Sequence, residues 1–324
     1  MEVASRVVTF CYLIRSIGLK EKDQVIFNSA LEDIKNKNSN AALIKLQSLD
    51  SKYPNQIKII LALIKAFNLS KNIDQAINLT FEYYSDLVRD PKNFQELFET
   101  FLADKRFIDA RTIALKMENP AKNINQSRIL KLENQFRKTH GNQILIYQKR
   151  LAHISVNSPA WQNKVIIQSK RFLPLKDFLF AAKLVLRDPF VWEPTKTKIL
   201  KLLLSAGEQS SIELNWLNKK VIKLDLFDLI QENFQVISNL HSLVDELYGQ
   251  DDPTKQNFLH KQLSVQDDYL FPYADQVISD PNFWLGATES SLFGNELAVN
   301  NELQAKMLSW IKLIQREEMK SQLE

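Results

Sequence analysis

Apolar residues recur at intervals of three and four along most of the chain, which is the spacing of one helix face. The clearest run starts at Ile230 and continues through Phe234, Ile237, Leu240, Val244 and Leu247, and Gly249 is well placed to end that helix. A second run, Leu303, Met307, Trp310 and Ile314, predicts an amphipathic helix near the end of the sequence. The pattern therefore predicts a predominantly all-α protein.

One stretch departs from helical spacing. Ile212, Leu214 and Trp216 alternate with polar residues, and alternation continues from Val221 to Leu226 after a short polar turn. Two alternating segments around a short turn predict a β-hairpin near residues 211–226. An isolated hairpin is only marginally stable in water, so we expect this one to pack on helices.

Four prolines directly follow an aspartate. The pairs are Asp90-Pro91, Asp188-Pro189, Asp252-Pro253 and Asp280-Pro281. Aspartate is a favoured N-cap, and proline suits the first helical position because no hydrogen bond needs its missing N–H there. The sequence therefore predicts a helix start at each pair.

A long period runs through the first third of the sequence. Ala42, Ala76 and Ala110 are each 34 residues apart. The same period aligns Ala30 with Ile64 and Phe98, Leu46 with Thr80 and Ala114, and the pairs Lys37-Asn38, Lys71-Asn72 and Lys105-Arg106. Self-similarity at a fixed period indicates stacked supersecondary units, because a helical hairpin alone buries only part of its apolar surface.

A period of 34 is that of the tetratricopeptide (TPR) repeat, and residues 23–124 resemble three such units. The likeness implies TPR-like helical hairpins stacked as an α-solenoid, with a generic helical bundle as the alternative. The aromatic residue expected in the first helix of each pair is present as Phe67 and Phe101 but is Asp33 in the first unit. We expect three parts: a lead segment, 1–22; three degenerate repeats, 23–124; and a helical C-terminal region with one inserted β-hairpin, 125–324.

A second resemblance covers roughly residues 23–324. The run from Leu186 to Val191, then Lys196 to Leu200, then a short hairpin and a helical tail, is similar to the YsoA-type TPR proteins of low-GC Gram-positive bacteria. That family has no established biochemical role. The likeness therefore implies a fold and a cytoplasmic setting and no mechanism.

In TPR proteins the first helix of each pair lines a groove that holds a segment of another protein. The resemblance places ten residues in that groove: Gln24, Phe27, Leu31, Lys58, Leu61, Lys65, Asn68, Lys92, Gln95 and Glu99. TPR domains that clamp a chaperone's C-terminal carboxylate use Lys and Asn where this chain has Phe27 and Leu31, so that ligand is not expected. The mixture of Leu61 and Lys65 suits a partly apolar, partly acidic segment. The alternative is that the repeats only support the C-terminal half.

No pattern points to catalysis. The sequence has no G-x-G-x-x-G, G-x-x-x-x-G-K-[ST], G-x-S-x-G or H-E-x-x-H. The four histidines, His140, His153, His241 and His260, are isolated from one another along the chain. Ser309 and Lys312 spell S-x-x-K without the accompanying K-T-G. The pairs Asp251-Asp252 and Asp267-Asp268 could bind a hard cation, but paired aspartates are more typical of helix caps and solvated loops. We predict a non-enzymatic protein without cofactor or metal.

Charge is unevenly distributed. Residues 122–224 contain 19 Lys and Arg against 6 Asp and Glu, whereas residues 225–324 contain 6 against 17. The basic residues of the middle third include Arg128, Lys131, Arg137, Lys138, Lys149, Arg150, Lys170 and Arg171. They are either solvated helix faces, some of them meeting the acidic tail, or a surface for RNA or DNA phosphates. Trp161, Phe172 and Phe178 could stack on bases, although at helical spacing they also suit a core.

Composition and cysteine content indicate the class of protein and the cellular compartment that suits it. The 324 residues are 45% hydrophobic with a net charge of +4, which is the profile of a folded globular protein. The single cysteine, Cys11, excludes an intramolecular disulfide and favours a reducing compartment. The apolar run Val7 to Ile14 is too short to span a bilayer and is expected to form a short packed helix or strand. We expect a cytoplasmic protein whose partner is another protein, with nucleic acid as the alternative and no membrane association.

Overall fold

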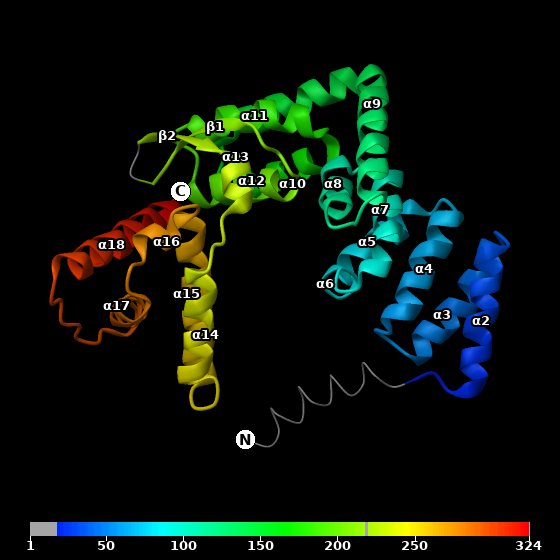
Figure 1. The fold of residues 1–324 in the computed structure, drawn as a ribbon, viewed down its shortest axis with the longest axis horizontal. Helices are drawn as coiled ribbons and strands as arrows, with labels where there is room; N and C mark the ends of the chain where they lie inside the picture. The colour runs from blue at the N-terminus through cyan, green and yellow to red at the C-terminus, as the bar shows by residue number, and fades with distance from the viewer. Residues whose placement is uncertain (1–17, 218–219, 324) are drawn as a thin grey trace. The chain divides into compact units, whose positions relative to one another are not determined.

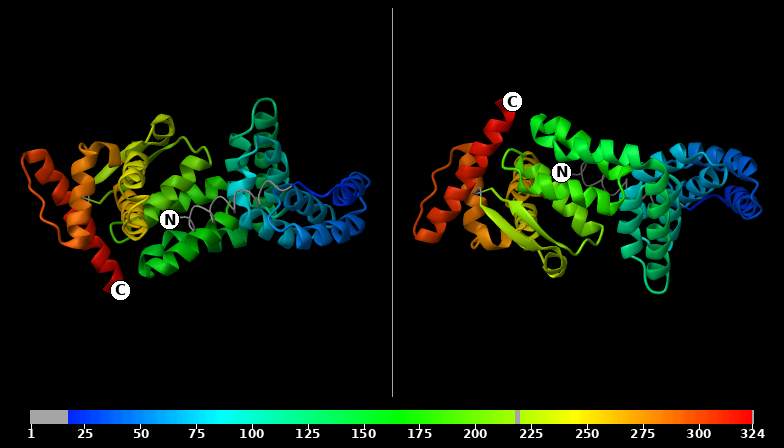
Figure 2. Two further views of the ribbon diagram at one scale, coloured as in Figure 1. Left: turned by 90° about the horizontal axis from the view of Figure 1, so that it is seen from below. Right: turned by 90° about the horizontal axis from the view of Figure 1, so that it is seen from above.

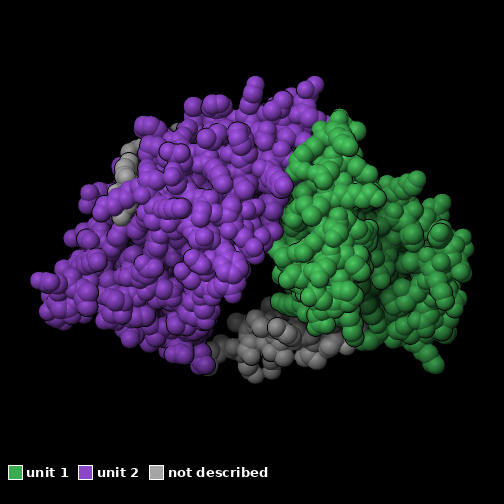
Figure 3. All heavy atoms as spheres, turned by 45° about the horizontal axis from the view of Figure 1, so that its top comes forward, with its two compact units in different colours: residues 1–139 green, residues 140–324 purple. Residues whose placement is uncertain are grey.

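A computed structural model describes residues 18–217 and 220–323. It is predominantly helical, with one two-stranded antiparallel sheet in the described part of the chain, which confirms the expected class. The chain divides into two compact units, unit 1 (residues 1–139) and unit 2 (residues 140–324), coloured separately in Figure 3. The expected packing of Val7 to Ile14 lies outside the described residues.

Unit 1 consists mainly of three helical hairpins. Its helices are α2 (Glu21–Lys35), α3 (Ser39–Lys52), α4 (Ile57–Leu69), α5 (Ile73–Glu82), α6 (Tyr84–Leu87), the 3₁₀ turn η1 (Pro91–Asn93), α7 (Phe94–Ala103), α8 (Phe107–Leu115) and the first part of α9 (Ala121–Ala152). The hairpins pair α2 with α3, α4 with α5, and α7 with α8. Figures 1 and 2 show these pairs following one another along unit 1, from blue to cyan.

The 34-residue period corresponds to a repeated core. Ala42, Ala76 and Ala110 have no exposed surface, because each lies where the second helix of its hairpin packs against its neighbours. The aligned positions are equally buried: Ala30, Ile64, Phe98, Leu46, Thr80 and Ala114 are all 0% exposed. The sequence period therefore identifies core positions correctly in all three hairpins.

The turn inside each hairpin repeats as well. Lys37, Lys71 and Lys105 adopt the left-handed backbone conformation, with φ of 61°, 61° and 58°. In each turn the next residue donates its N–H to a carbonyl five residues back: Asn38 to Asp33 at 2.8 Å, Asn72 to Phe67 at 2.9 Å and Arg106 to Phe101 at 2.8 Å. This is the Schellman ending of a helix, usually made by glycine. Three lysines in the same rare conformation show that the repeat extends to the backbone.

The first part of α9 packs on the third hairpin. Arg111 on α8 makes a two-pronged ion pair with Glu133 on α9, and the rings of Phe107 and Phe136 meet edge to face at 5.5 Å. The helix is interrupted at His140, beside Gly141, where the backbone is not helical (φ −125°, ψ 25°). The compact unit therefore extends beyond the expected repeat boundary at residue 124, to residue 139.

Unit 2 contains the rest of α9, η2 (Ile154–Val156), α10 (Pro159–Phe172), α11 (Leu175–Arg187), α12 (Glu193–Ser205), β1 (Ser211–Asn215), β2 (Val221–Asp225), α13 (Leu226–Gln231), α14 (Val236–Tyr248), α15 (Pro253–Leu270), α16 (Ala274–Val277), α17 (Pro281–Phe293) and α18 (Glu302–Leu323). The predicted hairpin is present, with Ile212 opposite Leu224, and it packs on α11. Ile212, Leu214 and Trp216 are buried, as their alternation predicts.

Three of the four Asp-Pro pairs start helices. Asp90, Asp252 and Asp280 each accept a backbone hydrogen bond just after the proline, at the start of η1, α15 and α17. The prediction is wrong for Asp188, whose carboxylate accepts from the N–H of Phe190 in a turn, and α12 begins only at Glu193. Aspartate followed by proline suits a turn as well as a helix start, and packing chooses between them.

Two helices differ from their predicted limits. The run from Ile230 to Leu247 is broken between α13 and α14, and only Val236, Leu240 and Val244 of α14 are buried. On α18 the buried face is formed by Met307, Ile311 and Ile314, whereas Leu303 is 62% exposed. Helical spacing identifies a stripe along a helix, but the neighbouring elements decide how far that stripe extends.

Candidate functional site

The ten predicted groove residues lie on the first helices of the three hairpins. Gln24, Phe27 and Leu31 are on α2; Lys58, Leu61, Lys65 and Asn68 are on α4; Lys92 is in η1; and Gln95 and Glu99 are on α7. These helices contact one another in order, α2 with α4 and α4 with α7. The fold therefore places residues that are 34 apart in sequence on neighbouring helices.

Between α2 and α4 the contact is largely apolar. Phe27 is 7% exposed, and the Lys58 ammonium lies 5.8 Å from the centre of its ring, within cation–π range. Leu31 remains 39% exposed, and Lys58 is exposed too. The Lys58 ammonium and the Leu31 side chain are thus accessible on these two helices, whereas the Phe27 ring beneath Lys58 is buried.

Between α4 and α7 the contact is a hydrogen-bonded network. The Asn68 amide donates to the Glu96 carboxylate at 2.8 Å and to the Thr100 hydroxyl at 2.7 Å. Burial raises the pKa of Glu96, and the Asn68 hydrogen bond and the nearby charge of Lys65 partly oppose that rise. Glu96 and Thr100 were not among the predicted groove residues, because helical spacing alone does not show which polar side chain meets Asn68.

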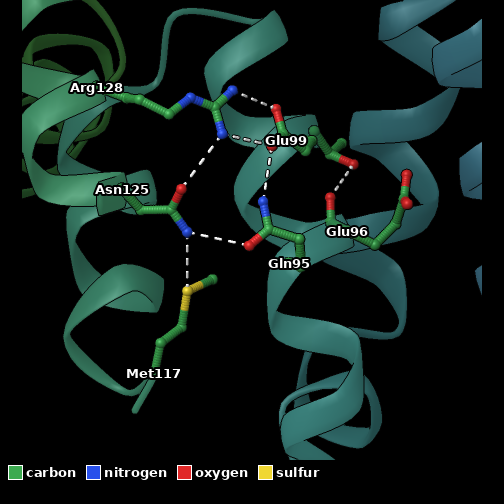
Figure 4. Close-up of polar contacts among 7 residues, drawn as sticks. Gln95, Glu96, Glu99, Met117, Asn125 and Arg128 are labelled. Carbon is green, nitrogen blue, oxygen red and sulfur yellow. Dashed lines mark hydrogen bonds and ion pairs between the residues drawn. The ribbon is translucent and has the colours of Figure 1, made fainter. Parts of the chain in front are cut away.

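A further polar network joins α7 to α9 (Figure 4). The Asn125 amide donates to the Gln95 side-chain oxygen at 3.0 Å, and the Arg128 guanidinium bonds both oxygens of Glu99, at 2.7 and 2.9 Å. Gln95 in turn donates to Glu99 at 2.7 Å. The Glu99 hydrogen bonds raise the pKa of Arg128. Gln95 and Glu99 are therefore engaged with α9, which lies beside α7 as a further helix of the series.

The eight basic residues proposed as one patch fall into two groups. Arg128, Lys131, Arg137 and Lys138 belong to unit 1, and Lys149, Arg150, Lys170 and Arg171 belong to unit 2. In the first group, Arg128 pairs with Glu99 and Arg137 lies 4.0 Å from Glu133. Part of this positive charge is thus balanced by carboxylates within the same unit.

The unit 2 group contains an aromatic stack. The rings of Tyr147 and Phe172 lie face to face, with centres 4.5 Å apart and planes 17° apart. The Arg150 guanidinium lies 5.5 Å from the Tyr147 ring, and that of Arg171 lies 5.3 Å from the Phe172 ring. Flat rings beside guanidinium groups are a recurring feature of single-stranded nucleic-acid sites. Of the other two aromatic candidates, Phe178 is fully buried, whereas Trp161 is 47% exposed.

Two of the histidines, which are isolated from each other along the chain, meet in the folded structure. His241 on α14 and His260 on α15 approach to 2.6 Å between their Nδ1 atoms, and His260 Nε2 lies 2.8 Å from an Asp245 oxygen. Burial and the neighbouring His260 lower the pKa of His241. The two residues are 19 apart in sequence, and the α14–α15 hairpin brings them together. Among the described residues, no group of three or more His, Cys, Asp or Glu is placed to hold a metal ion.

The serine of the S-x-x-K pattern and three of the paired aspartates have structural contacts. The Ser309 hydroxyl donates to the backbone oxygen of Lys306 at 2.6 Å, inside α18. Asp252 caps α15, and Asp267 and Asp268 both accept from Lys201, at 2.7 and 3.4 Å. These groups are engaged in helix capping and ion pairing.

No protein-family model, curated protein or solved structure matches the chain. Within residues 18–217 and 220–323, no helix is both long enough and apolar enough to cross a membrane.

Proposed function

We propose that unit 1 is a TPR-like α-solenoid that binds a segment of another protein, and that the chain acts as a non-enzymatic scaffold. The observation that carries this proposal is the repeat itself, which unites a 34-residue period, a shared buried core and the same left-handed turn in three successive hairpins. Such an array presents its first helices side by side as one extended surface. The likeness to YsoA-type proteins is part of the same proposal.

The proposed binding surface is centred on α2 and α4. Lys58 is exposed and Lys65 half-buried, and Leu31 and Leu61 supply apolar area beside them. Gln95 and Glu99 are already bonded to Asn125 and to Arg128 on α9, so they shape the end of the surface. A ligand that matches this chemistry is a peptide segment with apolar side chains spaced between acidic ones.

The experiment is an affinity pull-down of the tagged full-length protein from the lysate of its source, with and without nuclease. The test variant combines Lys58→Glu with Lys65→Glu. A matched control combines Lys37→Glu with Lys71→Glu, which reverses the same number of charges in the same unit at exposed turn positions. Circular dichroism establishes that both variants are folded.

We expect that one discrete protein is retained by the wild-type protein after nuclease treatment. The control variant should retain it as well, and the test variant should not. Retention of that protein by both variants contradicts the proposed surface. Absence of any retained protein favours the alternative in which the hairpins only support the rest of the chain.

The second candidate function is association with single-stranded nucleic acid through the Tyr147–Phe172 stack, with Arg150 and Arg171 as phosphate contacts. The pull-down with nuclease distinguishes this candidate from the peptide-binding surface. Bound material that disappears with nuclease, and whose binding weakens steeply with salt, supports this candidate over the peptide surface.

A further inference from the structure

An open pocket of about 640 Å³ lies in unit 2 between α10, α12 and α15. Its walls are mostly apolar and include Ile166 on α10, Leu202 on α12, and Trp192 and Pro194 at the start of α12. A volume of a few hundred Å³, apolar walls and a small number of polar groups are the usual properties of a small-molecule site. The pocket lies in unit 2, so it is independent of the peptide surface proposed for unit 1.

Two lysines on α12, three residues apart, supply the positive charge of the pocket. Lys201 is balanced by carboxylates, since its ammonium contacts Asp267 at 2.7 Å and Asp268 at 3.4 Å. Lys198 is different. Its ammonium donates to the side-chain oxygen of Asn163, and within the part of the chain that the structure describes it makes no ion pair.

The surroundings of Lys198 favour an additional anion. Burial lowers the pKa of Lys198, the neighbouring Lys170 lowers it further, and Asp268 opposes the shift. Lys198 is exposed, but its ammonium is partly dehydrated at the pocket and its hydrogen-bond partner there is a neutral amide, so its charge is less well stabilised than that of a lysine paired with a carboxylate. An anionic group bound in the pocket would give Lys198 a charged partner, as Asp267 and Asp268 do for Lys201, and one negative charge is enough for this single cation.

We propose that this pocket binds a small amphipathic monoanion, with its apolar body against Ile166, Trp192 and Leu202 and its acidic group at Lys198. The ring of Trp192 is fixed by a hydrogen bond from its Nε1 to the Tyr269 hydroxyl at 2.9 Å, so that wall of the pocket is formed before a ligand arrives. A preformed apolar wall and a positioned cation reduce the ordering that binding requires. The ligand class is therefore an aromatic or aliphatic compound with one carboxylate, sulfonate or similar group.

The test uses two fluorescent dyes with the same ring system. 1-Anilinonaphthalene-8-sulfonate carries one negative charge, and N-phenyl-1-naphthylamine is its uncharged counterpart. Each is titrated against the full-length protein and against three variants. Lys198→Met removes the charge and keeps the length of the side chain. Ala160→Trp places a large ring at an exposed position of the pocket rim.

The third variant, Lys176→Met, is the control, because Lys176 is an exposed lysine of α11 outside the pocket. We expect the wild-type protein to bind the sulfonate dye at least about tenfold more tightly than the neutral dye, the value of one charge-assisted hydrogen bond. Lys198→Met should remove that preference and leave the affinity for the neutral dye unchanged. Ala160→Trp should weaken the binding of both dyes, and Lys176→Met should change the binding of neither.

Three results would overturn the proposal. The first is equal affinity of the wild-type protein for the two dyes, or binding of neither. The second is a sulfonate preference that survives Lys198→Met. The third is dye binding that Ala160→Trp does not change, because the dyes then occupy another surface. Circular dichroism of each variant separates a lost site from a lost fold.

Discussion

The ion pair between Arg111 and Glu133 holds the first part of α9 on the third hairpin, and its removal has a calculable effect. Two bonds join the side chains, Nη2 to Oε2 at 2.8 Å and Nε to Oε1 at 3.2 Å. The Glu133 side chain is 1% exposed and that of Arg111 is 14% exposed. Because Glu133 has almost no access to water, its carboxylate depends on the protein for stabilisation.

The two single substitutions should therefore differ. Arg111→Met leaves the Glu133 carboxylate buried, with Arg137 a weaker partner at 4.0 Å, and should lower the free energy of unfolding by about 3 kcal/mol. Glu133→Met leaves the Arg111 guanidinium without this partner but still in reach of solvent, and should lower the free energy of unfolding by about 2 kcal/mol. The double variant replaces the pair by two apolar side chains of similar length, and should lie within about 1 kcal/mol of the wild type.

The assay is urea unfolding followed by two signals. All five tryptophans lie between residues 161 and 310, so their fluorescence reports on unit 2, whereas far-ultraviolet circular dichroism reports on both units. We expect the substitutions to move the circular dichroism transition and to leave the fluorescence transition nearly unchanged. A double variant less stable than either single variant, with the two losses adding, would refute the reasoning, because a buried pair requires non-additivity of at least about 2 kcal/mol.

Two further predictions concern unit 1. Ala42 is fully buried and its neighbour Ala41 is exposed, so Ala42→Arg should lower the melting temperature by at least about 5 °C while Ala41→Arg leaves it nearly unchanged; equal melting of the two variants contradicts the assigned core. Hydrogen bonds from Lys52 and Tyr53 lower the pKa of Asp23, so its carboxylate stabilises the fold above the unfolded pKa of about 3.9 and this contribution is lost as the pH falls through the folded pKa. The wild type should therefore lose more stability than Asp23→Asn between pH 5 and pH 2 in urea titrations, and parallel losses would show that this carboxylate contributes nothing.

The candidate surface was only partly predictable. The resemblance to TPR units assigned Phe27, Lys58 and Asn68 to the first helices of their hairpins, and they lie on α2 and α4, because a 34-residue repeat gives equivalent positions to equivalent elements. The sequence did not show that Glu99, a predicted groove residue, is bonded to Arg128, a residue of the predicted basic patch. Helical spacing shows the side of a helix on which a residue lies, but the identity of the facing residue depends on how two helices are rotated against each other.

Local patterns specify local structure in this chain. The alternation around residue 214 is enough for a hairpin, and the recurring alanines are enough for a repeated helical core, because both signals are complete within a few tens of residues. The contact of His241 with His260, the cation of Lys198 at the mouth of an apolar pocket and the turn at Asp188 came only from the folded chain. Each depends on side chains or elements brought together by packing, and that packing sets the distances, the burial and therefore the electrostatics on which function rests.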